Sequence, residues 1–304
     1  MNFMTSIAIP SPLRLITLGS RVAFIGSCFA QNMGTRMRQS GFPALVNPFG
    51  VLYNPLSILQ ALAQNPTHDK LYFEDERQQW HCWLTDSSMN ASSIDSCKAA
   101  VLSARGKLFA PLPDTMVITL GTNHYYDYQG LAVGNCHKQP QQWFTEHVLT
   151  TEQAVNALLQ ICQLFAHTQI IFTVSPYRYA KYGFHENQLS KSTLLLAIEE
   201  VMRSRPEQVC YFPAYELVLD ELRDYRFYKP DMLHPSDQAV DYIWEKFAQT
   251  CLDEKSQQFL KDYEPIRKAL AHKPEDPDSP EAIAFREQTH NRLNELLIKY
   301  NIEP

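Results

Sequence analysis

The chain has 304 residues, of which 45% are hydrophobic and 20% charged. These fractions are those of an ordinary folded protein, and they exclude disorder for most of the chain. The formal net charge of -6 argues against a nucleic acid as the main partner. No apolar run approaches the roughly 18 residues that a membrane span needs, so we expect no membrane partner.

The cysteines predict a reducing compartment. There are seven of them, widely spaced and without a CxxC pair. This pattern fits neither a disulfide framework nor a structural zinc site. The N-terminal segment is interrupted by prolines and lacks the basic and long apolar regions of a signal peptide. We therefore expect a cytoplasmic protein.

Short apolar segments alternate with helix-like segments along the first 250 residues. The strands are predicted over residues 22–25, 44–46, 116–120, 169–174 and 208–212. The helices between and after them are predicted over residues 29–39, 55–64, 152–166, 187–203 and 236–250. Apolar strands that alternate with helices are typical of a parallel sheet buried between helices. The fold class predicted from this pattern is α/β.

Two regions depart from this alternation. Residues 71–84 favour two short strands around a charged turn, which indicates a small β-hairpin insertion. After residue 251 the strand signals stop, and a Pro- and Asp-rich break at 272–282 precedes a helical pattern over 283–300. We predict a catalytic domain over residues 1–250 and a helical C-terminal extension over 251–304. A homodimer through the last helix is one possibility, although a single amphipathic helix more often packs on its own domain.

Polar residues directly follow several predicted strands, where ligands bind in open α/β sheets. Ser27 follows the first strand, at the start of a helix. In that position it fits a nucleophile or merely a helix cap. Asp231 and His234 lie three residues apart ahead of the last predicted helix. A carboxylate that orients a histidine forms the base that a serine nucleophile needs, although the pair also fits a surface turn.

Two further turns hold candidate donors to an oxyanion. The side chain of Asn123 follows the strand at 116–120, and the backbone N–H of Gly50 follows the strand at 44–46. Either group can donate to a negatively charged oxygen. Asn and Gly are also common in ordinary turns, so each motif alone is weak.

The order of these four motifs resembles that of the SGNH hydrolase superfamily, and the sequence GSCFA at residues 26–30 resembles the signature of its GSCFA branch. The resemblance covers roughly residues 16–247. Other stretches that look like the same family are NPFGVLYNP (47–55), GNCHK (134–138), NQLSKSTLL (187–195) and DYRFYKPDMLHPS (224–236).

This resemblance implies a three-layer α/β/α sandwich with a mainly parallel central sheet. It implies Ser27 as nucleophile, His234 as general base and then acid, and Asp231 as the residue that orients His234. The oxyanion hole would comprise the backbone N–H groups of Ser27 and Gly50 and the side chain of Asn123. His124 stands where the superfamily's usual GxND motif has its acid. Such a site needs no cofactor.

Other residues are candidates for substrate binding. The family-like segments and the ends of the strands supply them: Asn47, His124, His137, Ser175 and Arg178. Arg178 suits an anionic or sugar-bearing substrate or, equally, a surface ion pair. Cys136 beside His137 has no second ligand pair nearby, so we predict no metal site.

Cys28 is adjacent to the predicted nucleophile. Successive residues of a helix point about 100° apart, so only one of Ser27 and Cys28 can face the site. The family pattern selects Ser27. We therefore expect Cys28 to pack against the sheet.

The predicted function is a serine esterase that removes a small acyl group, such as acetyl, from a carbohydrate. Aromatic side chains suit sugars, although at least half of them are expected to pack the hairpin insertion onto the sheet. The aromatic residues concerned are Tyr125, Tyr126, Tyr128, Trp80, Trp83 and Trp143. The alternatives are an acyltransferase that delivers the acyl group to a carbohydrate and a catalytically inactive binding module of the same fold.

Overall fold

The centre of the molecule is a sheet of five parallel strands. The computed structural model describes residues 4–302, and its main sheet has the strand order β10-β9-β5-β1-β2. All five predicted strands form, within one residue at each end. The strands are β1 (Val22–Gly26), β2 (Ala44–Val46), β5 (Thr115–Leu120), β9 (Gln169–Val174) and β10 (Val209–Tyr211). Side chains of β1, β5 and β9 are buried along their whole length, as expected of strands covered on both faces.

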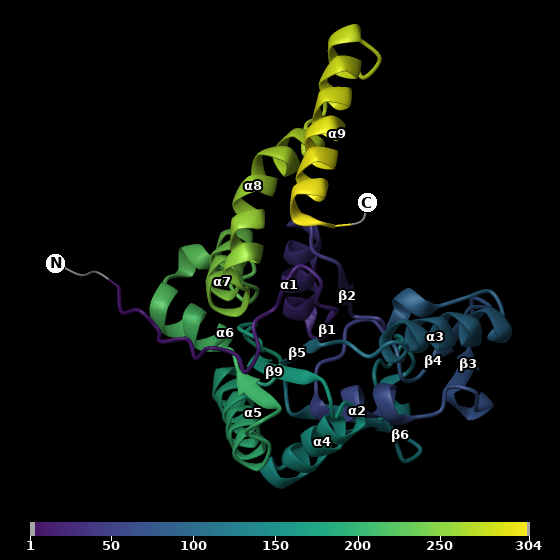
Figure 1. Cartoon of the computed structure of the whole chain (residues 1–304). Helices are drawn as coiled ribbons and strands as arrows, with labels where there is room; N and C mark the ends of the chain where they lie inside the picture. The colour runs from purple at the N-terminus through teal and green to yellow at the C-terminus, as the bar shows by residue number, and fades with distance from the viewer. Residues whose placement is uncertain (1–3, 303–304) are drawn as a thin grey trace.

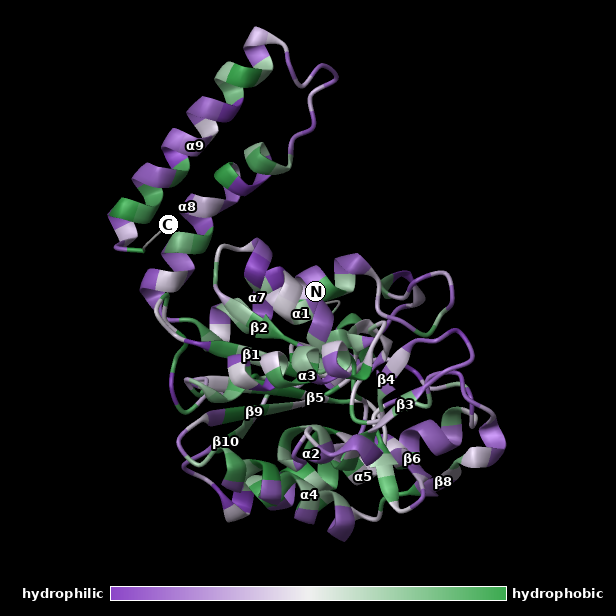
Figure 2. Cartoon of the chain, turned by 90° about the vertical axis from the view of Figure 1, so that its right-hand side faces the viewer, coloured by the Kyte–Doolittle hydropathy of each residue, from purple (hydrophilic) through white to green (hydrophobic). Residues whose placement is uncertain are grey.

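Helices cover both faces of this sheet, as Figures 1 and 2 show. On one face, α2 (Pro55–Ala63), α3 (Ile94–Phe109), α4 (Thr151–Leu164) and α5 (Phe184–Ser204) share one hydrophobic cluster with the strands. On the other face, α1 (Cys28–Gln39) and α7 (Asp237–Cys251) share a second cluster. The predicted three-layer α/β/α sandwich is confirmed. Helix α3 is an addition that the sequence analysis missed.

The strand order reverses beside β1. The chain first moves outward from β1 to β2 and then returns to place β5 on the other side of β1. Such a reversal leaves a crevice at the carboxyl ends of the two central strands. At this point β1 and β5 approach closely, because a Cβ on Gly26 would lie 2.1 Å from the carbonyl oxygen of Thr119. Gly26 also has a φ of +129°, so no other residue fits there without strain.

Two smaller sheets lie beside the main one. Strands β3 (Tyr72–Glu74) and β4 (Trp80–Cys82) pair antiparallel and confirm the predicted hairpin insertion. Strands β6 (His124–Tyr128), β7 (Leu131–Val133) and β8 (Thr145–Val148) form a second antiparallel sheet, which the sequence analysis missed. The sequence signal for it is Gly130: Gln129 and Gly130 both adopt positive φ, as a two-residue hairpin turn requires, and glycine does so without strain.

Short helical segments join these elements. Just before the loop that carries His234, α6 (Ala214–Glu216) continues into the π-helix η4 (Leu217–Leu222). The remaining segments are the 3-10 helices η1 (Asp69–Leu71), η2 (Ser87–Met89), η3 (Gln141–Trp143) and η5 (Tyr225–Phe227).

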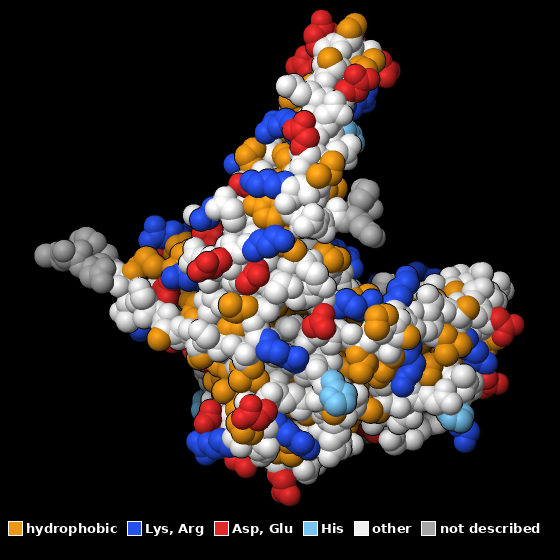
Figure 3. Space-filling model, in the orientation of Figure 1, with side chains coloured by type: hydrophobic (Ala, Val, Ile, Leu, Met, Phe, Trp, Pro, Cys, Tyr) orange, Lys and Arg blue, Asp and Glu red, His pale blue; other side chains and the backbone are white. Residues whose placement is uncertain are grey.

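The C-terminal extension is a hairpin of two helices that projects from the body (Figures 1 and 2). It comprises α8 (Glu254–Ala271) and α9 (Pro280–Tyr300), of which only α9 was predicted as a helix. At its base the ring of Phe259 packs edge-on against Phe42, at 5.6 Å between centroids. Acidic, basic and hydrophobic side chains are interspersed along the projection (Figure 3). The domain division and the homodimer stay predictions.

No helix among residues 4–302 is both long enough and apolar enough to cross a membrane.

Candidate active site

A cavity of about 460 Å³ opens at the carboxyl ends of the central strands. Its wall contains Cys28 after β1, Tyr53 after β2, Thr122 after β5 and Tyr177 after β9, together with His234. The cavity therefore lies where the strand order reverses. A larger cavity, of about 720 Å³, lies between α1, α7 and α8, and none of the predicted site residues lines it.

His234 and Asp231 form a hydrogen-bonded pair. The Nδ1 atom of His234 lies 2.5 Å from Oδ2 of Asp231. The other carboxylate oxygen accepts the backbone N–H groups of Leu233 and His234, at 2.9 and 3.0 Å. The hydrogen bonds from these backbone groups and from the imidazole lower the pKa of Asp231 to about 2. The carboxylate therefore stays ionised, holds the proton on Nδ1 and leaves Nε2 as the nitrogen able to accept one.

Arg178 holds this loop in place. Its backbone N–H donates to the carbonyl of Leu233 at 3.1 Å, and its guanidinium donates to the carbonyl of Met232 at 3.1 Å. The guanidinium also lies over the rings of Phe184 and Tyr228, at 4.4 and 5.4 Å. Arg178 does not line the 460 Å³ cavity. Arg178, which was predicted to contact the substrate, thus stabilises the turn that bears His234.

Ser27 and Cys28 have the reverse of the expected orientations. Ser27 is only 2% exposed and is the N-cap of α1, where its Oγ accepts the backbone N–H of Phe29 at 3.3 Å. Cys28 is partly exposed and lines the cavity, so the expectation that it packs against the sheet is wrong. The physical reason is that a capping side chain turns back over the first turn of its helix. The role of Ser27 as nucleophile stays a prediction.

The surroundings of the Cys28 thiol act in opposite directions on its protonation. Burial raises the pKa of Cys28 above its usual 9.0. Hydrogen bonds from the backbone N–H groups of Cys28 and Phe29 oppose this shift, as do the positive charges of Lys191 and Lys229. The thiol therefore rests protonated, and it needs a base to become a nucleophile.

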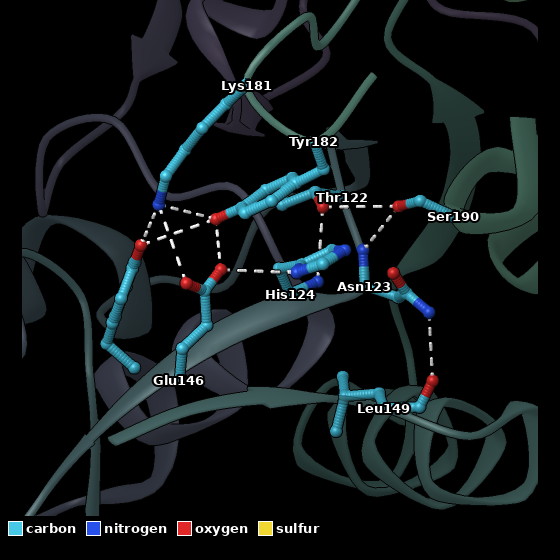
Figure 4. Close-up of polar contacts among 9 residues, drawn as sticks. Thr122, Asn123, His124, Glu146, Leu149, Lys181, Tyr182 and Ser190 are labelled. Carbon is cyan, nitrogen blue, oxygen red and sulfur yellow. Dashed lines mark hydrogen bonds and ion pairs between the residues drawn. The ribbon is translucent and has the colours of Figure 1, made fainter. Parts of the chain in front are cut away.

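The predicted oxyanion donors already have acceptors within the protein. The N–H of Ser27 donates to Thr119 O at 3.1 Å, and the N–H of Gly50 donates to Asn47 O at 2.8 Å. The side-chain amide of Asn123 donates to the carbonyl of Leu149 at 3.0 Å, as Figure 4 shows. None of Ser27, Gly50 and Asn123 lines the cavity. Buried polar groups find partners within the fold, and these three groups have done so.

Three of the predicted substrate-binding residues are buried inside the fold and do not line the cavity. Asn47 accepts the backbone N–H of Gly26 at 2.9 Å through its side chain. Ser175 is fully buried directly after β9. His137 packs among the rings of Phe73, His81 and Trp83 beneath the β3–β4 hairpin, where burial lowers its pKa to about 4. Position after a strand does not by itself distinguish a residue that lines the cavity from one buried beside it.

His124 does line the cavity, and it belongs to a polar wall that Figure 4 shows. Its ring stacks on Tyr182 at 4.2 Å, and its Nδ1 lies 3.2 Å from the carboxylate of Glu146. The hydroxyl of Tyr182 donates to the same carboxylate, and Lys181 forms an ion pair with it at 3.5 Å. Sequence analysis missed Glu146 because it lies on β8 of the unexpected sheet. Burial raises the pKa of Glu146, but Tyr182 and Lys181 outweigh it and the net direction is downward.

Two family models match the sequence over most of its length. One, described as the GSCFA family, matches residues 21–247, and one described as the C-terminal domain of GSCFA domain proteins matches residues 263–303. The chain belongs to the GSCFA family. This is the family that the motif at residues 26–30 predicted.

Solved structures of similar fold include two of a family two carbohydrate esterase from Clostridium thermocellum. An active-site mutant has 14% identity and a TM-score of 0.39, and a complex with cellohexaose has 14% identity and a TM-score of 0.37; each match covers 80% of this chain and 66% of that chain. An acetyl xylan esterase from the rumen bacterium Butyrivibrio proteoclasticus has 11% identity and a TM-score of 0.39. That match covers 76% of this chain and 64% of the esterase chain. This GSCFA chain thus spans slightly less than two thirds of those chains. No curated protein matches the sequence.

One buried lysine ties the carboxyl ends of two strands together in this GSCFA protein. Lys191 of α5 is 1% exposed, and its Nζ donates to the carbonyls of Gly121 and Ser175 at 2.6 and 2.8 Å. The rings of Tyr179 and Tyr215 flank it at 5.7 and 5.8 Å. Burial lowers the pKa of Lys191 to about 7.

Across residues 4–302, no three His, Cys, Asp or Glu side chains are arranged to hold a metal ion.

Proposed function

We propose that this GSCFA-family protein is an enzyme that cleaves a carboxylic ester through a covalent acyl-enzyme. The observation that carries the proposal is the His234–Asp231 pair, with 2.5 Å between Nδ1 and Oδ2, at the wall of the cavity. A histidine oriented by an ionised carboxylate is the base that activates hydroxyl and thiol nucleophiles. The first turn of α1, which supplies Cys28 to the same cavity, brings such side chains to it.

In the proposed reaction, Nε2 of His234 takes the proton from a nucleophile on the first turn of α1. The resemblance to the superfamily predicts that this nucleophile is Ser27. Asp231 remains ionised and stabilises the imidazolium that forms. His234 then returns the proton to the leaving alcohol, and water hydrolyses the acyl-enzyme with His234 again acting as base.

The substrate we propose is a small acyl group, such as acetyl, on a carbohydrate. A cavity of about 460 Å³ falls within the size range of small-molecule sites. Six tyrosines line it, and tyrosine offers both a ring face and a hydroxyl to a sugar. These residues are Tyr53, Tyr125, Tyr126, Tyr177, Tyr179 and Tyr182.

The test is hydrolysis of a panel of acetylated sugars and simple acyl esters by the wild type and by His234→Gln. Loss of the base is expected to lower kcat by about 10³- to 10⁴-fold. The matched control is His290→Gln, because His290 is exposed on α9, outside the residues that line the cavity. Equal activity of His234→Gln and wild type on the preferred ester would refute the proposal.

A further inference from the structure

We propose that Cys28, and not Ser27, is the nucleophile, so that the acyl group passes through a thioester on its Sγ atom. This inference rests on the ester reaction proposed above and assigns its covalent step. Ser27 then has a structural role as the cap of α1.

The geometry at the start of α1 favours Cys28. Ser27 and Cys28 are adjacent at the start of α1, where only one of the two side chains can point into the crevice. The hydroxyl of Ser27 is buried and accepts a hydrogen bond from Phe29 N–H, which fixes it against the helix. Cys28 instead shares the cavity wall with His234.

The surroundings of His234 support the same assignment. Tyr177 packs against the imidazole of His234, at 4.3 Å between ring centroids. Tyr177 and Cys28 also line the same cavity. Cys28, Tyr177 and His234 therefore share one cavity wall, at the carboxyl ends of the strands.

The electrostatic surroundings of Cys28 also favour it. Cys28 is the first residue of the 12-residue helix α1, whose N-terminal N–H groups carry partial positive charge. The backbone N–H groups of Cys28 and Phe29 and the positive charges of Lys191 and Lys229 all act to lower the pKa of the thiol, against the effect of burial. These groups favour the thiolate that forms when His234 removes the proton.

A comparison with the other cysteines sharpens the assignment. Five of the seven are buried, whereas Cys28 and Cys136 are partly exposed and line the same cavity. Cys136 lies outside the helices and strands, in the segment between β7 and η3, and burial raises its pKa to about 11. Cys28 is therefore the cavity thiol that combines a helix N-terminus with a nearby base.

The reaction has two parts, acylation of the thiol and hydrolysis of the thioester. Nε2 of His234 accepts the proton of the Cys28 thiol, and the sulfur attacks the carbonyl carbon of the ester. The carbon–oxygen bond to the alcohol then breaks, the alcohol leaves with the proton from His234, and a thioester remains. Water gives a proton to His234 and its oxygen attacks the thioester carbonyl; the carbon–sulfur bond then breaks, the carboxylic acid leaves, and His234 returns the proton to the sulfur.

The experiment traps the acyl-enzyme with p-nitrophenyl acetate by rapid acid quench and maps it by mass spectrometry. The proteins compared are the wild type, Cys28→Ala, Cys28→Ser and Ser27→Ala, each checked for folding by thermal melting. We expect acetyl on Cys28 in the wild type and in Ser27→Ala, with neutral hydroxylamine removing it as it does thioesters. Cys28→Ala is expected to form no adduct and to lose turnover by about 10³-fold or more.

Two outcomes would overturn the assignment. An adduct that persists in Cys28→Ala and disappears in folded Ser27→Ala would identify Ser27 as the nucleophile. Full turnover by Cys28→Ala without any adduct on that segment would exclude a covalent role for either residue. Cys28→Ser, which differs by a single atom, controls for loss of packing.

A second measurement separates this assignment from the proposed ester reaction. Iodoacetamide is reacted with a Cys136→Ser background, which removes the other partly exposed thiol, with and without His234→Gln. We expect selective alkylation of Cys28, slowed about tenfold or more by His234→Gln because the base is lost. If no ester is hydrolysed but this pattern appears, the ester reaction fails and the Cys28–His234 pair stands. If His234→Gln leaves the alkylation rate unchanged, the pair itself is refuted.

Discussion

Two groups of polar residues lie at the carboxyl edge of the sheet, and they differ in how their hydrogen bonds are used. The strand-end scaffold, as we call it, comprises Asn47, Gly50, Asn123, Ser175 and Lys191. The open wall comprises Cys28, His124, Lys181, Tyr182 and His234.

Each scaffold residue makes a hydrogen bond with a backbone group. Lys191 joins the ends of β5 and β9, and Asn47 joins the end of β1 to the segment after β2. The wall residues line the cavity, and several pair with other side chains, as His124 does with Glu146. A polar residue after a strand therefore marks this edge of the sheet, and the scaffold differs from the wall in that its polar groups are bonded to the backbone inside the fold.

The largest expected effect comes from the carboxylate that orients His234 of the open wall. Asp231→Asn removes the carboxylate that holds the proton on Nδ1 of His234, and we expect kcat to fall by about 10³- to 10⁴-fold with little change in KM. Steady-state kinetics on the preferred ester would measure this. The control is Asp241→Asn, which also loses an ion pair, at 2.6 Å to Arg36, but lies outside the cavity wall. Similar losses in both variants would show that the Asp231 effect is one of general stability.

A change in the scaffold is expected to act on stability instead. A Cβ at Gly50 would lie 2.0 Å from the carboxyl carbon of Asp86, at a φ of +78°. Gly50→Ala is therefore expected to lower the free energy of unfolding by about 3 kcal/mol, from strain and overpacking together. Gly130→Ala is the matched control, because Gly130 has a φ of +85° but no atom within 4 Å of its Cβ position. Urea denaturation of the two variants would separate the cost of backbone strain from that of overpacking. Equal losses of unfolding free energy in both variants would contradict the tight packing at Gly50.

Lys191 is expected to make stability depend on pH. Its pKa is about 7 in the folded protein against 10.5 as the ordinary value. Between these pH values the unfolded chain binds a proton that the folded chain has lost, so this residue makes stability rise with pH. We expect the free energy of unfolding of the wild type, relative to Lys191→Met, to increase from about pH 7 to pH 10.5. A difference independent of pH across this window would show that Lys191 is protonated throughout.

The smallest expected effect concerns substrate binding at the wall. Glu146→Gln keeps the shape of the side chain but removes the charge that holds Lys181 and His124. We expect KM for an acetylated sugar to rise by about three- to tenfold with kcat nearly unchanged, since the loss is one of hydrogen bonds made by partly exposed groups. The control is Glu152→Gln, exposed at the start of α4. A fall in kcat without a change in KM would place Glu146 in the chemical step instead.

The sequence by itself determined the central sheet and much of its surroundings. An apolar run such as residues 116–120 is typical of a strand that is buried on both faces. The type and the bounds of such a strand can therefore be predicted from the local sequence. The pairing of Asp231 with His234 is also local, because a single turn brings residues three apart together. The motif at residues 26–30 identified the family.

Tertiary structure alone decided which side chains face the cavity. The β6–β8 sheet brings Glu146 to His124, 22 residues away, and no periodicity in the sequence specifies that contact. The choice between Ser27 and Cys28 depended on which side chain capped α1, and the choice between scaffold and wall depended on which polar atoms met a backbone partner. The cap at Ser27 is a contact within the first turn of α1, whereas the choice between scaffold and wall follows from the cost of burying an unpaired polar group, which depends on the assembled fold.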